Sequence, residues 1–226
     1  IENLLNTGSP DGNKWIPAEV DVSIRPGWFY HKEQDEKVKS PDTLLSLYYQ
    51  SVGRGACLDL GLSPDRRGLL NDNDVNSLKK FGTILKSTFA VNLAKDATLK
   101  ASNVRGGNLA KFGPAHLLDN DRYSYWATDD KVKTPELILD LKNPKTFNVI
   151  RLRENIKLGQ RIEEVALDAW QDGKWAQIGS ATSIGGNRLI RLPQNITASK
   201  VRLRITKSPV CIALSDFGLY EEPDHI

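Results

Sequence analysis

The feature that most constrains the fold is a change in hydrophobic period near residue 92. Before that point, segments that alternate like strands are separated by segments with helical spacing. After it, only short strand-like segments follow one another, separated by turn residues. We therefore predict two units, an α/β part over residues 1–92 and an all-β part over residues 93–226.

The first part contains the signals of strand, helix, strand and helix in turn. Residues 19–24 alternate polar and apolar side chains, which is the period of a strand. Ser40 followed by Pro41 is typical of a helix start, and Asn71 is a second N-cap candidate. Between these helices, residues 56–62 form the nearly continuous apolar run of a buried parallel strand.

The second part contains segments typical of short strands and no segment typical of a long helix. The turn pairs between them include Asp172–Gly173. Such spacing favours an antiparallel β-sandwich. The candidate strands are residues 137–141, 147–152, 165–170, 174–178, 188–192, 201–205 and 210–220.

The composition of the chain argues against some classes of binding partner. The chain has 31 basic and 28 acidic residues, a net charge of +3, which is too little for a nucleic-acid-binding surface. No apolar run reaches the roughly 18 residues of a membrane span. Cys57 and Cys211 both lie in apolar runs and are expected to be buried free thiols. Because the chain starts at Ile1 and has no Met, we interpret it as part of a longer protein.

Two acidic residues on the first strand are candidates for chemistry. Glu19 and Asp21 lie two positions apart, so both carboxylates should share one face, with Cα atoms roughly 6.6–6.8 Å apart. Retaining glycosidases hold two carboxyl groups about 5–5.5 Å apart. The alternative is that Glu19 and Asp21 orient other polar groups or pair with Arg25.

Asp59 is a charge inside the second strand, and it needs a partner, water or a ligand. It is expected either to face the interior of a barrel or to pair with Arg54, Arg66 or Arg67, and the ion pair is the favoured alternative.

Aromatic residues surround the acidic strand and could stack on sugar rings. These residues are Trp15, Trp28, Phe29 and Tyr30, of which Phe29 is expected to belong to the core. His31 could act as an acid or base, although a single histidine beside a charged loop is weak support. With three histidines and no close Cys or His partner, a zinc site is not expected.

An acidic loop in the second half has the residue types of a calcium site. Asp119 and Asp121 alternate just before Ser124, and such oxygen ligands suit Ca²⁺. An Asx-turn held by its own backbone is an equally good interpretation. Separately, Asn195 and Thr197 form an N-glycosylation sequon, which matters only in a eukaryotic secretory context.

Two blocks of sequence resemble known families. Residues 15–30, which read WIPAEVDVSIRPGWFY, and residues 49–55, which read YQSVGRG, resemble the end of the catalytic domain of family 29 α-L-fucosidases. The resemblance is greatest to the group that prefers branched α-1,3/1,4-linked fucose. The second half resembles coagulation factor 5/8 type C domains and family 32 carbohydrate-binding modules, and residues 155–162 resemble the version appended to these fucosidases.

The resemblance implies a fold of two parts. Residues 1–92 would be the final strands and helices of a (β/α)8-like catalytic barrel, and residues 93–226 a galactose-binding-like β-sandwich, or jelly roll. It also implies a retaining mechanism with an Asp nucleophile and a Glu acid/base. In the family both residues precede the segment that matches here, so the catalytic pair would lie upstream of Ile1 and this chain alone would be inactive.

The resemblance also assigns roles to individual residues. Trp15 would stack on fucose, with Glu19, Asp21 and Arg25 supporting the substrate-binding site. In the sandwich, a structural Ca²⁺ or an equivalent hydrogen-bonded loop would involve Asp119, Asp121 and Ser124 on one side and Asp216 on the other. Two positions depart from the family pattern: Asp59 stands in a run that is often L-L-L-N, and Lys14 stands where an acid is frequent.

The expected parent protein is a periplasmic or extracellular exo-acting α-L-fucosidase that needs no cofactor for catalysis. Its substrate would be a fucosylated oligosaccharide or glycan. The competing hypothesis is a non-catalytic carbohydrate-binding module attached to an inactive barrel remnant.

Overall fold

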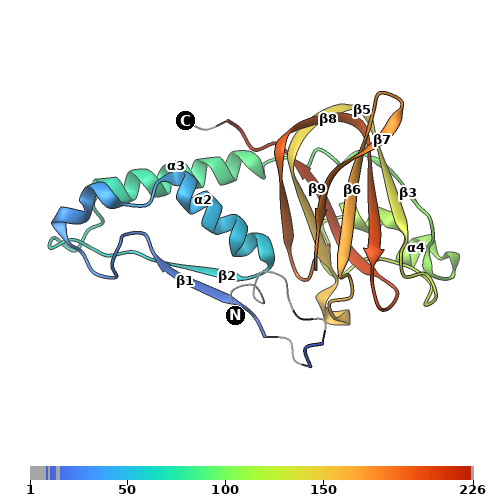
Figure 1. The fold of residues 1–226 in the computed structure, drawn as a ribbon, viewed down its shortest axis with the longest axis horizontal. Coiled ribbons are helices and arrows are strands. Elements are labelled where there is room, and N and C mark those ends of the chain that lie inside the picture. Colours follow the sequence, from blue (N-terminus) through green and yellow to red (C-terminus); the bar gives the residue numbers. More distant parts are fainter. Residues whose placement is uncertain (1–8, 10, 14–15, 225–226) are drawn as a thin grey trace. The chain divides into compact units, whose positions relative to one another are not determined.

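The structure, a computed structural model, describes residues 9, 11–13 and 16–224 of the chain (Figure 1). Contacts divide these residues into two units, and each is described by itself below. The N-terminal unit contains residues 16–90 and 222–224, whereas the sandwich unit contains residues 9, 11–13 and 91–221. Trp15 and Lys14, which the sequence analysis singles out, lie outside the described residues.

The N-terminal unit is a β–α–β arrangement followed by a second long helix (Figure 1). Strands β1 and β2 are parallel and pair in register, with Glu19 opposite Cys57 and Asp21 opposite Asp59. The elements are β1 (Glu19–Ser23), η1 (Lys32–Lys37), α2 (Pro41–Gln50), η2 (Val52–Arg54), β2 (Cys57–Gly61) and α3 (Asp72–Thr88).

Both long helices begin where the capping residues predict. The Ser40 hydroxyl accepts a hydrogen bond from the Thr43 backbone N–H at 3.2 Å, and Pro41 occupies the first turn of α2. The Asn71 side chain accepts from the Asn73 N–H at 3.0 Å and caps α3. These two predictions are confirmed.

The sandwich unit is built from antiparallel strands in the order β4-β9-β5-β8-β6-β7, with β3 also pairing with β5. Short helical turns connect some of the strands. The elements are β3 (Thr98–Ala101), η3 (Arg105–Gly107), α4 (Leu109–Phe112), η4 (Pro114–Leu118), β4 (Trp126–Ala127), β5 (Glu136–Glu154), η5 (Ile156–Leu158), β6 (Glu164–Gln171), β7 (Lys174–Ala181), β8 (Arg188–Lys207) and β9 (Ala213–Tyr220).

Two long strands connect the two layers of the sandwich. The first part of β5 pairs with β3 and the last part with β9, while β8 accompanies β5 along both. The separate strands predicted at 137–141 and 147–152 are therefore one strand, as are those predicted at 188–192 and 201–205. The prediction was wrong here because the chain kinks without leaving the sheet: the β5–β8 register shifts between Asp140 and Lys145, and Lys142 has a φ of 66°.

A single hydrophobic core fills the space between the layers. Along β8, Val201, Leu203 and Ile205 are buried and alternate with arginines, as the period of 2 predicts. Trp126 is fully buried on β4, and its indole N–H donates to the Asn103 carbonyl at 2.9 Å.

Two predictions of burial were wrong. Phe29 was expected in the core but is 77% exposed, and Cys57 was expected to be buried but is exposed. Both residues belong to the β1–β2 region, where a face of the strand pair is open in the described structure. Cys211 is buried, and both cysteines are free thiols, as predicted. Among the described residues, no helix is long and apolar enough to cross a membrane.

A buried carboxylate at the end of β5 joins two loops of the sandwich. Glu154, the last residue of β5, accepts hydrogen bonds from the backbone N–H groups of Arg161, Ile162 and Gly185 at 2.7–2.9 Å. Burial raises the pKa of Glu154 to about 7, although the three N–H groups and the charge of Arg161 oppose this. Glu154 therefore gives the sandwich a titration near neutral pH.

We predict that the sandwich loses stability as the pH rises from about 4.5 to about 7. The folded-state pKa of Glu154 lies above the ordinary value of 4.5, so the folded protein binds the proton more tightly than the unfolded chain. The stabilising contribution is complete below about pH 4.5, and about 3 kcal/mol is lost as the pH passes through 7. Denaturant unfolding measured across this pH range gives the dependence of the unfolding free energy on pH and tests the prediction.

The matched variant is Glu154→Gln, which cannot titrate. Glu154→Gln should lower the free energy of unfolding at every pH, because the amide NH2 of the new side chain would face a backbone N–H donor. It should also flatten the dependence of that free energy on pH. An unchanged slope in this variant would show that another group causes the pH dependence.

Candidate functional site

The exposed face of the β1–β2 pair carries the acidic residues predicted as candidates. Since neighbouring parallel strands are in register, Glu19 and Asp21 share a face with Cys57 and Asp59, and all four are exposed. Glu19 and Asp21 do not pair with Arg25, and Asp59 makes no ion pair with any arginine among the described residues. The ion-pair alternatives proposed from the sequence were therefore wrong.

Arg25 lies just after β1 and is the buried centre of the N-terminal unit. Its Nε and Nη2 donate to the two carboxylate oxygens of Asp74 in α3, and its Nη1 lies 3.0 Å from Asp35 Oδ1. The side chains of Arg25 and Asp74 are completely buried. These hydrogen bonds, with that to Asp74 the strongest, raise the pKa of Arg25 above its ordinary value. Arg25 was predicted to support the substrate-binding site, and its donors are engaged by Asp74, Asp35 and the His31 carbonyl. These contacts suit a supporting role, and a contribution of Arg25 to substrate binding stays a prediction.

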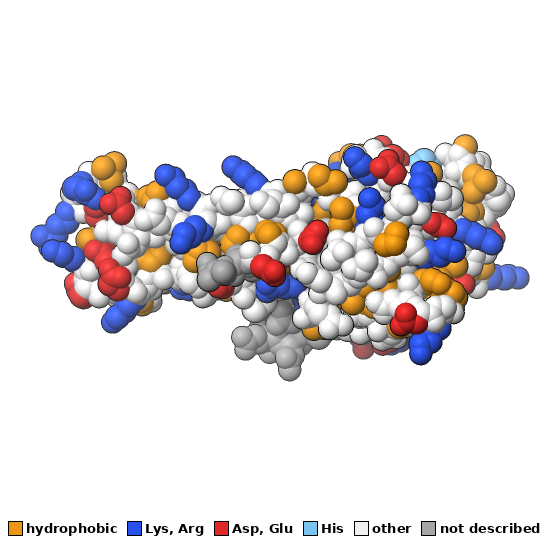
Figure 2. All heavy atoms as spheres, turned by 90° about the horizontal axis from the view of Figure 1, so that it is seen from above, with side chains coloured by type: hydrophobic (Ala, Val, Ile, Leu, Met, Phe, Trp, Pro, Cys, Tyr) orange, Lys and Arg blue, Asp and Glu red, His pale blue; other side chains and the backbone are white. Residues whose placement is uncertain are grey.

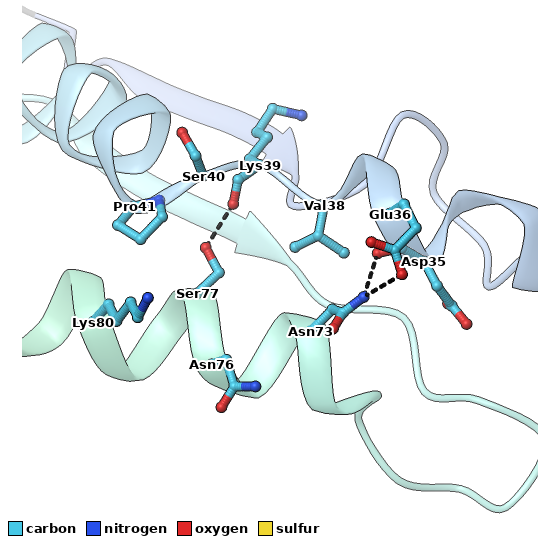
Figure 3. Close-up of a pocket in the computed structure, with 10 residues that line it drawn as sticks. All are labelled: Asp35, Glu36, Val38, Lys39, Ser40, Pro41, Asn73, Asn76, Ser77 and Lys80. Atoms are coloured by element: carbon cyan, nitrogen blue, oxygen red, sulfur yellow. Dashed lines mark hydrogen bonds between the residues drawn. The ribbon is translucent and has the colours of Figure 1, made fainter. Parts of the chain in front are cut away.

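A second set of contacts fixes η1 to α3 (Figure 3). The Asn73 amide donates to the Asp35 carbonyl at 2.9 Å and to Glu36 Oε1 at 3.3 Å, and the Ser77 hydroxyl donates to the Lys39 carbonyl. Figure 3 shows the Asn73 side chain reaching from α3 toward η1, and the Ser77 side chain reaching toward Lys39, between η1 and α2. Both residues line a hollow of about 230 Å³. The long loop after β1 is therefore held at several points.

A larger pocket, of about 480 Å³, lies between the loop that follows β1 and the loop that follows β2. Residues 30–33 line one side and residues 65–67 the other. Both loops leave the carboxyl ends of parallel strands, which is where α/β proteins place their ligands. Sequence reasoning missed this pocket: it considered Arg66 and Arg67 only as partners of Asp59, and no pattern in the sequence marks residues 65–67 as a pocket wall.

The acidic loop of the sandwich is closed by its own hydrogen bonds. Asp119 accepts from the Asp121 N–H at 2.8 Å and from the Ser124 hydroxyl at 2.7 Å, and His116 lies 3.0 Å from the same carboxylate. Burial acts to raise the pKa of Asp119, but these hydrogen bonds hold it below the ordinary value. Asp121 in turn accepts from the Tyr123 N–H at 2.9 Å. This is the Asx-type arrangement that the sequence left as one of two alternatives.

Asp216, the second half of the predicted calcium site, is paired with arginines. Its carboxylate lies 2.9 Å from Arg151 Nη2 and 3.5 Å from Arg153 Nη1. Burial raises the pKa of Asp216, and the two arginines oppose that rise. Within the described part of the chain, no three His, Cys, Asp or Glu residues cluster in a way that could hold a metal ion. The residues present thus fit a hydrogen-bonded loop better than a calcium cage.

Comparison with known proteins explains this two-part organisation. Residues 98–221 match the family model for the F5/8 type C domain, and residues 3–88 match the family model for α-L-fucosidase. The chain belongs to the F5/8 type C domain family. Its F5/8 type C domain, a β-sandwich, follows a segment similar to α-L-fucosidases.

The relatives carry both parts in the same order. α-L-Fucosidase 1 of Arabidopsis thaliana is 36% identical over 94% of this chain and 42% of its own length. Among solved structures, SpGH29 aligns with a TM-score of 0.89 at 39% identity, covering 98% of this chain and 48% of that one. A Ruminococcus gnavus GH29 fucosidase solved in complex with fucose aligns with a TM-score of 0.88 at 31% identity, covering 96% and 43% respectively. The chain thus spans less than half the length of these relatives.

We predict that the loop of the F5/8 type C domain depends on Asp119 and not on bound metal. Asp119→Ala removes the acceptor for two hydrogen bonds that close the loop and should lower the unfolding free energy by about 1–2 kcal/mol. Asp96→Ala, at an exposed carboxylate of the same unit that makes no side-chain hydrogen bond or ion pair with other described residues, is a matched control for the loss of a carboxylate. EDTA should leave the melting temperature unchanged. A rise with added calcium would instead support the metal site predicted from Asp119, Asp121, Ser124 and Asp216.

In the α-L-fucosidase-like segment, Asp74→Ala should destabilise the protein by about 3 kcal/mol or more. The change leaves the buried Arg25 guanidinium with one carboxylate in place of two. Asp72→Ala is the matched control, since Asp72 lies in the same first turn of α3 but is exposed. Urea unfolding of both variants measures the difference, and equal losses would mean that the Arg25 pair contributes nothing beyond the helix dipole.

Proposed function

We propose that this chain is the C-terminal portion of an exo-acting, retaining α-L-fucosidase that removes terminal fucose from oligosaccharides or glycans. The observation that carries the proposal is the similarity to α-L-fucosidases across both units, at 31–39% identity over at least 94% of the chain. The branched α-1,3/1,4 linkage preference is part of the proposal and rests on the sequence blocks around residues 15–30 and 49–55.

The N-terminal unit has the features expected of the last strands of a (β/α)8-like barrel. Two parallel strands joined by a helix form the repeating unit of that fold. The strand pair is open on the face that carries Glu19, Asp21 and Asp59, whereas Val20 and Val22 on the other face are half-buried. Parallel sheets are normally covered on both faces, so the open face suits a place inside a larger barrel.

The nucleophile and the general acid/base are proposed to lie upstream of Ile1. The carboxylates of Glu19 and Asp21 make no hydrogen bond or ion pair with other described residues, whereas catalytic carboxylates need neighbours that hold and tune them. We assign Glu19 and Asp21 to the lining of the barrel and Trp15 to stacking on the fucose ring. On this assignment the 226 residues alone are inactive.

The sandwich is proposed to act as a carbohydrate-binding or packing module, and the parent enzyme as periplasmic or extracellular. Catalysis of this kind uses carboxyl groups and requires no cofactor. The partner is a fucosylated oligosaccharide or glycan.

Trp15→Ala in the full-length protein tests the site. The loss of one stacking surface should lower kcat/KM for a nitrophenyl fucoside by on the order of 10²-fold and leave the melting temperature unchanged. Trp170→Ala, at a partly exposed tryptophan of β6, is the matched control and should retain activity. An unchanged kcat/KM for Trp15→Ala would remove Trp15 from the site.

The full-length protein also serves to test the proposed fucosidase activity itself. Turnover of a nitrophenyl fucoside or a Lewis-type trisaccharide measures the activity. NMR of the first product measures retention, because it distinguishes α-fucose from β-fucose. No turnover of either substrate would favour the non-catalytic binding module, and hydrolysis by the 226 residues alone would return Glu19 and Asp21 to consideration as catalytic residues.

A further inference from the structure

The pocket between the loops after β1 and β2 has rigid walls. Asp65 accepts three hydrogen bonds from Arg67, from its backbone N–H at 2.8 Å and from its Nε and Nη2 at 2.9 and 2.6 Å. The Asp65 N–H in turn donates to the Leu69 carbonyl at 2.8 Å. On the opposite wall, the Tyr30 hydroxyl donates to Asp35, the residue that Arg25 holds. The pocket is therefore formed in advance of any ligand.

Positive charge is in excess within this pocket. Asp65 forms an ion pair with Arg67, and the side-chain hydrogen bond from Arg67 lowers the pKa of the Asp65 carboxyl. Glu33 has only a distant contact, 3.9 Å from His31. Lys32 and Arg66, both exposed, have no carboxylate partner in the described part of the chain. Three cationic side chains, those of Lys32, Arg66 and Arg67, therefore line the pocket against the two carboxylates of Glu33 and Asp65, an excess of one positive charge.

Exposed aromatic rings lie in the same loop, just before the pocket. Trp28 is 55% exposed, and its ring lies directly over Gly61 at the end of β2, where an added Cβ would come within 3.0 Å of the ring. Phe29 is also exposed. Large apolar rings fixed beside polar groups suit the mixed surface of a sugar, with C–H groups on its faces and hydroxyls at its edges.

We propose that this pocket binds an anionic substituent, a carboxylate or a sulfate ester, on the part of the glycan that remains after fucose leaves. The inference rests on the proposed function, because it assigns the pocket to the substrate of that enzyme. Arg66 forms the charge-assisted contact, in which a guanidinium can donate two parallel hydrogen bonds to either group. Lys32 adds a second positive charge, and Trp28 supports the sugar that carries the anion.

The position of the pocket argues for a substituent of the substrate over a free anion. It lies at the carboxyl ends of β1 and β2, the edge at which barrels assemble their active sites. At about 480 Å³, it has room for a sugar residue and not only for an inorganic ion.

The experiment compares three substrates with the full-length protein: a neutral Lewis-type trisaccharide, its sulfated form and its sialylated form. We expect kcat/KM for at least one acidic form to exceed that for the neutral form by about tenfold. Arg66→Gln should abolish that preference by lowering kcat/KM for the acidic form about tenfold more than for the neutral form, and added salt should reduce the preference in the wild-type protein. The two acidic arms distinguish sulfate from carboxylate.

Lys37→Gln removes one positive charge from η1 outside the pocket and is the matched control, which should keep the preference. Because Arg66 is exposed and makes no ion pair, Arg66→Gln should melt at the wild-type temperature. Lys32→Gln is a second variant that should lower the preference in part.

The outcomes distinguish a failure of the anionic pocket from a failure of the proposed function. Cleavage of the neutral substrate with no preference for either acidic form, or equal losses on all three substrates in Arg66→Gln, overturns the anionic pocket and leaves the fucosidase proposal standing. Failure to cleave any of the three overturns the proposed function and this inference together.

Discussion

The buried Arg25 guanidinium is the interaction on which the N-terminal unit depends. A charge taken out of water is costly unless it is paired and hydrogen-bonded, and Arg25 meets this demand with carboxylates from two different elements. Asp74 belongs to α3 and Asp35 to η1, so one side chain joins the end of β1 to both. The loop after β1 is long, yet its path is fixed by this single group and by the contacts of Asn73.

Buried charges in this protein are stabilised in two ways, by opposite charges or by backbone N–H groups. In the sandwich, Asp168 is almost fully buried on β6 and receives hydrogen bonds from Arg202 and Arg204 on β8, so it is again neutralised by opposite charge. Glu154 instead receives three backbone N–H groups. Dipoles stabilise a carboxylate less completely than a guanidinium does, which explains why burial raises the pKa of Glu154 to about 7 while the pKa of Asp168 stays below its ordinary value.

Local signals in the sequence predicted local structure well and burial less well. Ser40 and Asn71 cap their helices because a cap depends on residues within one turn. Phe29 and Cys57 were placed wrongly because burial depends on what packs against a residue, which hydrophobicity alone does not specify. The partners of Arg25 lie 10 and 49 positions away in the chain, and no pattern in the sequence connects them.

The same distinction explains where the candidate site could be found from sequence. The alternation of polar and apolar residues placed Glu19 and Asp21 on one face of β1, because sharing a face depends only on the period of a strand. The family resemblance pointed to the same two residues. The pocket after β2 arises from two loops that fold against each other, so residues 65–67 carry no signal until the fold is known. What the scaffold contributes is rigidity: Arg25 fixes one wall through Asp35, and Asp65 fixes the other through Arg67. Arg66 contributes nothing to this rigidity, so its side chain stays exposed in the pocket, and a substitution there should not destabilise the fold.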